Sequence, residues 1–235
     1  MTRALFLRHG ESVSNAHPTA ASLPAEEGDR LTERGRAQAR AAAEAVEPLR
    51  PALILTSTMG RARETTEVLN QHLGLPVEEL DYIHELRESA DYATLAPEQQ
   101  KLRRWSERMR KAAPDPDAAP EGAESWNDVL GRVRRLKEEL EWRPGVELPL
   151  IVTHGLFLRF FLFDSLLGDR IGPADAPLLW RARSLNCGLS LFVQGEKWHP
   201  ADPEIPGWSC ITWMARTWDP PPLPTERHPA SPGSV

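Results

Sequence analysis

The chain has 235 residues, of which 40% are hydrophobic and 26% charged, and its formal net charge is −6. This length and composition predict a globular protein with a sizeable core, and the acidic balance argues against a dedicated nucleic-acid binder. No run reaches the ~18 apolar residues of a membrane span, and the N-terminus lacks the pattern of a secretory signal. The two cysteines, Cys187 and Cys210, form no disulfide framework. We therefore expect a cytoplasmic protein without a membrane partner.

Strand-like and helix-like segments alternate along the chain. The first half predicts a strand at 4–7, a helix from an N-cap at Thr32 to about 49, a strand at 53–57, a helix at 60–73 and a strand at 77–80. The second half predicts a helix at 125–142, a strand at 150–153, a buried helix at 156–167 and strands at 189–193 and 210–214. This alternation is typical of βαβ units, so we expect a three-layer α/β/α fold with a mainly parallel central sheet.

Two stretches fall outside the alternation. Residues 89–120 contain one expected helix, at about 97–112, followed by a proline-rich loop. Residues 220–235 are rich in Pro and Ser, which predicts disorder; a passive tail is favoured over a polyproline ligand for a partner. We expect a single domain over 1–219 with an insertion at about 89–120.

The first expected strand runs into side chains that suit phosphate chemistry. Its apolar residues lead directly into Arg8-His9-Gly10, and the glycine permits a sharp turn. The guanidinium and the imidazole then lie at the carboxyl end of a strand, where open α/β sheets bind ligands. Arginine offers a planar fork for phosphate oxygens, and histidine can act as a nucleophile at neutral pH. An ordinary strand followed by two polar residues would have the same sequence pattern, so a phosphate site is supported only if the rest of the chain provides matching motifs.

Six short motifs follow one another in order. They are Arg8-His9-Gly10-Glu11-Ser12-Val13-Ser14-Asn15, Leu31-Thr32-Glu33-Arg34-Gly35-Arg36-Ala37-Gln38-Ala39, Ser57-Thr58-Met59-Gly60-Arg61-Ala62-Arg63-Glu64-Thr65, Leu86-Arg87-Glu88, Gly122-Ala123-Glu124-Ser125 and Thr153-His154-Gly155. In this register the chain resembles the histidine phosphatase superfamily, also called the phosphoglycerate mutase-like family, from residue 5 to about 188. The resemblance implies that the insertion at about 89–120 is a small helical cap over the active site.

The resemblance also implies chemical roles for matched residues. His9 would be the nucleophile, forming a phosphohistidine that water hydrolyses. Arg8 and Arg61 would clamp the phosphate, and His154 would face His9 across it. Substrate binding is expected from Arg8, Asn15, Arg61, His154 and Gly155.

The expected general acid is Glu88, which occupies the acidic position of the Leu-x-Glu motif. Glu85 lies three residues earlier and can share the same face of the loop, so the choice between the two stays open. The His, Asp and Glu residues show no metal-ligand spacing, so we predict activity without a metal or a cofactor.

The predicted function is a phosphatase that acts on a phosphorylated small molecule and binds no nucleic acid. In the mutases of this family a Glu-Asn-Arg-Phe-x-Gly-Trp pattern follows the first Asn, whereas residues 16–22 here show none of it, which favours the phosphatase. The alternatives are phosphoryl transfer of the phosphoglycerate mutase type, or a non-catalytic relative that binds a phosphate ligand or a protein. The sequence leaves the physiological substrate and the oligomeric state open.

Overall fold

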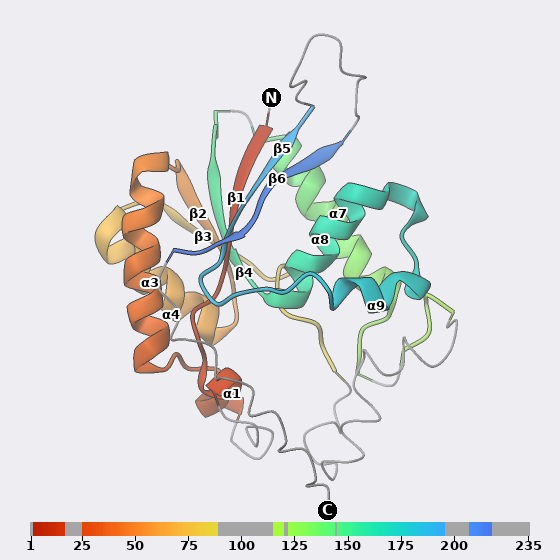
Figure 1. The fold of residues 1–235 in the computed structure, drawn as a ribbon, viewed down its shortest axis with the longest axis horizontal. Coiled ribbons are helices and arrows are strands. Elements are labelled where there is room, and N and C mark those ends of the chain that lie inside the picture. Colours follow the sequence, from red (N-terminus) through yellow and green to blue (C-terminus); the bar gives the residue numbers. More distant parts are fainter. Residues whose placement is uncertain are drawn as a thin grey trace, which may run out of the picture.

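The computed structural model describes residues 2–16, 25–88, 115–119, 122–143, 145–195 and 207–217. Six strands form one sheet in the order β3-β2-β4-β1-β5-β6 (Figure 1). The strands are β1 (Thr2–Arg8), β2 (Leu53–Ser57), β3 (Val77–Leu80), β4 (Pro149–Thr153), β5 (Leu189–Gln194) and β6 (Trp208–Ala215). The first four pair in parallel, whereas β5 pairs antiparallel with both β1 and β6. The predicted α/β fold with a mainly parallel sheet is confirmed.

Helices cover both faces of the sheet. On one face lie α3 (Glu33–Val46) and α4 (Gly60–Leu73), and on the other α7 (Trp126–Glu141) and α8 (Gly155–Leu167) (Figure 1). The shorter helices are α1 (Val13–Ala16), α2 (Ala25–Gly28) and α9 (Ala176–Leu179), and 3-10 turns occur at η2 (Glu47–Leu49), η4 (Gly168–Arg170) and η5 (Pro173–Asp175).

Local sequence explains where the long helices begin and end. Thr32 caps α3 as predicted, because its hydroxyl accepts a hydrogen bond from the Gly35 N–H at 3.0 Å. The α-helix stops at Val46, earlier than the expected residue 49, and Pro48 lies in the 3-10 turn that follows. Ser125 and Asp128 form a capping box at the start of α7, which fixes the entry of the chain into that helix.

The alternation of side chains along β1 builds two cores. Ala4 and Phe6 pack with the helices α7 and α8, whereas Leu5 and Leu7 pack with α3 and α4. All four side chains are 2% exposed or less, so β1 is buried on both faces of the sheet. The residues that follow β1 therefore start from a rigid position.

Two predicted segments cannot be compared with the fold. The cap helix at 97–112 and the tail at 220–235 both lie outside the described residues. The division into one domain over 1–219 with a cap and a tail accordingly stays a prediction.

Candidate active site

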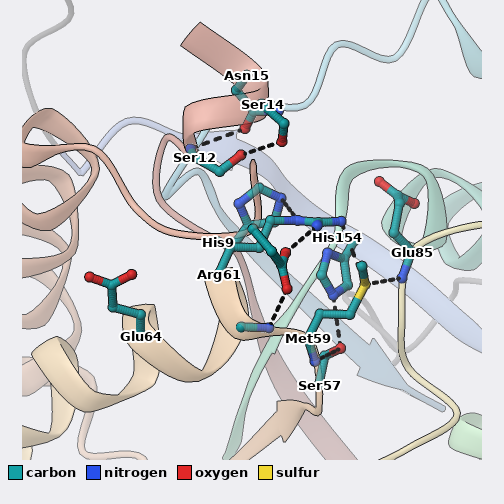
Figure 2. A network of polar contacts seen from close by, with 12 residues as sticks. His9, Ser12, Ser14, Asn15, Ser57, Met59, Arg61, Glu64, Glu85 and His154 are labelled. Atoms are coloured by element: carbon teal, nitrogen blue, oxygen red, sulfur yellow. Dashed lines mark hydrogen bonds and ion pairs between the residues drawn. The ribbon is translucent and has the colours of Figure 1, made fainter. Parts of the chain in front are cut away.

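Three neighbouring strands bring the predicted site residues together. The parallel strands β1, β4 and β2 end at the same edge of the sheet; His9 follows β1, His154 follows β4, and Ser57 ends β2. Arg61 lies in the first turn of α4. Figure 2 shows these four side chains gathered in one site. The ring centroids of His9 and His154 are 5.1 Å apart, so the two rings are direct neighbours at this edge of the sheet.

The contacts of His9 fix its tautomer. Its Nδ1 lies 2.7 Å from the carbonyl oxygen of Gly10, and because a carbonyl can only accept, Nδ1 carries the proton. Nε2 then holds the ring's lone pair, which accepts a hydrogen bond from Arg61 Nε at 3.1 Å. Burial, followed by the charges of Arg61 and Arg8, lowers the pKa of His9 well below its ordinary value. The ring is therefore a neutral base at pH 7, with its lone pair in the site.

Two glycines let the loop after His9 lie directly on helix α3. A Cβ added at Gly10 would lie 2.6 Å from the Gly35 carbonyl oxygen, and a Cβ added at Gly35 would lie 2.1 Å from the Glu11 carbonyl oxygen. Neither backbone atom can move aside without moving the loop. The Gly10 N–H also donates to Thr65 Oγ1 at 3.0 Å, so α4 holds the same turn.

Arg61 is held by an acidic residue that the sequence motifs did not identify. Its Nη1 donates to Asp29 Oδ1 at 2.5 Å, and the Arg61 side chain is only 12% exposed. Asp29 Oδ2 accepts from the N–H of Gly60, the first residue of α4, at 2.6 Å. Asp29 therefore ties the guanidinium to the start of its own helix and fixes the direction in which Nε donates.

Arg8 is held by backbone and amide oxygens. Its Nη1 donates to the Ser184 carbonyl at 2.6 Å, and its Nη2 lies 3.5 Å from Asn15 Oδ1. Asn186 Nδ2 donates to the same Asn15 oxygen and to the His9 carbonyl, both at 3.0 Å, which links α1 to the nucleophile. Burial lowers the pKa of Arg8 to about 10, so the guanidinium stays charged at neutral pH. Its buried Nε has no hydrogen-bond partner within the described part of the chain, so it can donate to a bound anion.

His154 lies at the start of helix α8. Its Nε2 is 2.8 Å from Ser57 Oγ, and its buried Nδ1 finds no hydrogen-bond partner among the residues described. Burial, followed by the charges of Arg61 and other neighbours, lowers the pKa of His154 well below its ordinary value. A Cβ at the next residue, Gly155, would lie 2.7 Å from Ser184 Oγ and 3.2 Å from Arg8 Nε. Glycine there lets the start of α8 approach the phosphate clamp.

Both candidate acids lie at the site. The two carboxylate oxygens of Glu85 lie 3.2 and 3.3 Å from the backbone N–H of Leu156, in the first turn of α8. Glu88 lines a cavity of about 310 Å³ together with Glu85, Arg8 and Gly155. The geometry thus brings both carboxylates to the phosphate clamp and keeps the two alternatives open.

The same cavity contains side chains that no motif pointed to. Trp180 is half-exposed on one wall, and Arg159 lies with its Cζ 4.8 Å from the Trp180 ring centroid. Arg159 Nη2 also lies 3.3 Å from Ser184 Oγ. Arg159 lies five residues after His154, which is not the i+3 or i+4 spacing that places two side chains on one face of a helix, so no signal in the sequence could place Arg159 or Trp180 at the site. A second cavity of about 500 Å³ lies beside Asp29 and Gly60 and is lined by mixed charges; neither histidine is among the described residues that line either cavity.

Two findings on the described residues bear on metals and membranes. Among them, no three His, Cys, Asp or Glu side chains are grouped so that they could hold a metal ion. In the same part of the chain, no helix has the length and apolarity that a membrane crossing requires.

Comparisons with known proteins give consistent matches. The sequence model of the histidine phosphatase superfamily (branch 1) matches residues 4–198. A Photorhabdus laumondii protein named "Probable phosphoglycerate mutase GpmB" is 31% identical over 195 residues, which cover 81% of this chain and 84% of that protein. Among solved structures, a mycobacterial glucosyl-3-phosphoglycerate phosphatase complexed with VO3 is 28% identical with a TM-score of 0.66, covering 92% of this chain and all of that one. A structure titled "Mycobacterial hydrolase 2" is 27% identical with a TM-score of 0.69, covering 93% of each chain.

Proposed function

Because the chain belongs to the histidine phosphatase superfamily (branch 1), we propose that it is a metal-independent phosphatase that hydrolyses a phosphomonoester through a phosphohistidine on His9. The observation that supports this most directly is the state of the His9 ring. Its Nδ1–H donates to the Gly10 carbonyl oxygen, so Nε2 carries the lone pair that would attack, and Arg61 Nε donates to that same nitrogen. A neutral imidazole presented in this way needs no separate base.

In the first step, His9 Nε2 attacks phosphorus, so that an N–P bond forms while the ester P–O bond breaks. Arg8 and Arg61 stabilise the charge on the equatorial oxygens, and His154 donates a further hydrogen bond. Glu88 gives its proton to the leaving oxygen, so the alcohol departs neutral. Glu85 is the alternative source of that proton.

In the second step, water attacks the phosphohistidine. The carboxylate that lost its proton takes one from the water, the N–P bond breaks, and inorganic phosphate leaves. His9 returns to its neutral state with Nδ1 protonated. The Nδ1 hydrogen bond to Gly10 stabilises the positive charge that the ring carries in the intermediate.

The substrate in this proposal is a phosphorylated small molecule. Its phosphate is held at His9 by Arg8, Arg61 and His154, and its leaving group occupies the cavity of about 310 Å³ beside Arg8. We assign the site to a single domain over 1–219, with a cap at about 89–120 and a cytoplasmic location. Asn15 and Gly155 contribute donors at the rim of the phosphate site.

A mutase is the second candidate, because relatives at about 30% identity bear that name. The mutase pattern is absent from residues 16–22, and a mutase must exclude water from its phosphohistidine. The structural relative named as a phosphatase supports the hydrolytic proposal. Phosphatase is therefore the first proposal.

The test is turnover of para-nitrophenyl phosphate by the purified protein in the presence of a chelator, beside His9→Ala. We expect hydrolysis that survives the chelator and disappears in the variant. Hydrolysis that requires an added metal, or that persists without His9, would contradict the proposal. If neither protein turns over the ester, a phosphoglycerate mutase assay is the next test, and mutase activity there would support the second candidate.

A further inference from the structure

Both candidate acids lie on a segment that has no regular structure of its own. Residues 81–88 follow β3 and form neither helix nor strand, so the backbone there needs partners from elsewhere. Arg132 of helix α7 supplies two of them: its Nη1 donates to the carbonyl oxygens of Tyr82 and His84 at 2.8 and 2.9 Å. One guanidinium thus fixes the backbone at two of the three residues that precede Glu85.

A second side chain holds the other end of this segment. Glu124 Oε2 accepts from the Arg87 N–H at 2.8 Å, and the Glu124 N–H donates to the Arg87 carbonyl at 3.0 Å. Both contacts are made at the residue immediately before Glu88. The backbone that presents Glu88 is therefore clamped on both its N–H and its C=O.

Arg132 and Glu124 also bind each other. Arg132 Nε and Nη2 donate to the two carboxylate oxygens of Glu124 at 2.7 and 2.9 Å, and the side chains are only 12% and 11% exposed. Burying an ion pair in this way costs desolvation that its own attraction barely repays. The remaining hydrogen bonds of the pair go to the backbone of residues 82–87, so its geometry serves the segment that holds the acids.

We propose that Arg132 and Glu124 are positioning residues for the general acid: they fix the backbone of residues 82–88 so that the carboxyl group reaches the leaving oxygen. This inference rests on the proposed phosphatase function and deepens it. Within the described part of the chain, the hydrogen bonds and the ion pair of Arg132 and Glu124 do not involve His9, Arg8 or Arg61. Their loss should therefore weaken proton transfer to the leaving group and leave attack by His9 intact.

The experiment compares two esters that differ in their need for a proton. The leaving group of glycerol 2-phosphate is an alkoxide, which must be protonated, whereas 2,4-dinitrophenyl phosphate releases a stable anion. General acids contribute about 100–10,000-fold, so partial misplacement in Arg132→Lys or Glu124→Gln should lower kcat/KM for the alkyl ester by about 10–100-fold. We expect kcat/KM for the dinitrophenyl ester to change by less than about threefold, because this quantity reports the transfer of phosphate to His9 and not the later hydrolysis, and its leaving group needs no acid.

Double variants identify the acid that is positioned. In the background of Glu88→Gln, adding Glu124→Gln should cause no further loss with the alkyl ester, because the group it positions is already gone. In the background of Glu85→Gln the two losses should add. The opposite pattern would assign the positioned acid to Glu85.

Lys137 provides the matched control on the same helix. It makes a buried ion pair with Asp164 at 2.7 Å and packs against the Phe161 ring, and neither contact involves residues 81–88. Lys137→Met should lower thermal stability. The ratio of kcat/KM for the alkyl ester to kcat/KM for the dinitrophenyl ester should stay at its wild-type value. Circular dichroism verifies folding, and if Arg132→Lys does not fold, the isosteric Glu124→Gln provides the test.

The outcomes separate this inference from the function on which it rests. If the wild type hydrolyses neither ester, the phosphatase proposal fails and the positioning role falls with it. If the wild type hydrolyses both and the variants lower kcat/KM for both equally, or Lys137→Met shifts the ratio of the two kcat/KM values as they do, only the positioning role is overturned.

Discussion

Ser57→Ala tests whether a hydrogen bond from strand β2 sets the tautomer of His154. Ser57 Oγ accepts from the Met59 N–H at 3.3 Å, and its own proton is available to His154 Nε2 at 2.8 Å. If the hydroxyl donates, Nδ1 of His154 must hold the ring proton, and that atom has no other partner in the described part of the chain. The Nδ1–H is then available to a phosphoryl oxygen, as the mechanism requires.

The size of the effect follows from the burial of this contact. Both side chains are fully buried, and leaving a buried polar group without its partner costs about 1–3 kcal/mol. If that energy is lost in the transition state alone, kcat falls by about 5–150-fold while KM changes little.

Steady-state kinetics with para-nitrophenyl phosphate measure this, and Thr56→Val is the matched control. Thr56 is the preceding residue on β2, and its buried hydroxyl accepts from Thr66 Oγ1 at 2.8 Å without reaching His154. Thr56→Val should lower stability and leave kcat near the wild-type value. A kcat within about twofold of wild type in Ser57→Ala, or an equal loss in both variants, would refute the assignment of the tautomer.

Three further predictions concern the clamp, the loop and pH. Arg61→Ala should lower kcat about 100–1,000-fold in the same assay, as expected for a lost transition-state donor. Gly35→Ala should lower the free energy of unfolding by about 1–3 kcal/mol in urea melts, because its methyl group would overlap the Glu11 carbonyl. Because burial lowers the pKa of His9 and His154, only the unfolded chain takes up these protons as pH falls through about 6.5. The free energy of unfolding should therefore be highest above that pH and should decrease by about 1 kcal/mol per histidine by pH 5.5. In His9→Gln the free energy of unfolding should fall less steeply with decreasing pH.

The sequence could predict the catalytic edge of the sheet because each active-site residue there follows a strand within a few positions. His9 comes two residues after the buried Leu7, and His154 directly follows β4, so the parallel pairing of β1 and β4 places both rings together. Gly35 belongs to one of the sequence motifs, but the sequence does not show why a glycine is needed there. The reason is its contact with the Glu11 carbonyl, which appears only when α3 is packed against the loop after His9.

Contacts between distant segments could not be predicted in this way. The pairing of Asp29 with Arg61 and of the Ser184 carbonyl with Arg8 joins segments that no periodicity links. The antiparallel pairing of β5 was also invisible, because its apolar run resembles that of a parallel strand. Glu85 and Glu88 could not be separated, since both lie on one irregular segment held by Arg132 and Glu124.

The most direct test of the account is to trap the intermediate. The protein is mixed with 2,4-dinitrophenyl phosphate, quenched in base within milliseconds, and digested for mass spectrometry. The account predicts a phosphate on His9 that is stable in base, labile in acid and absent from His9→Asn. Phosphate on any other residue, or continued hydrolysis with His9 replaced, would contradict it.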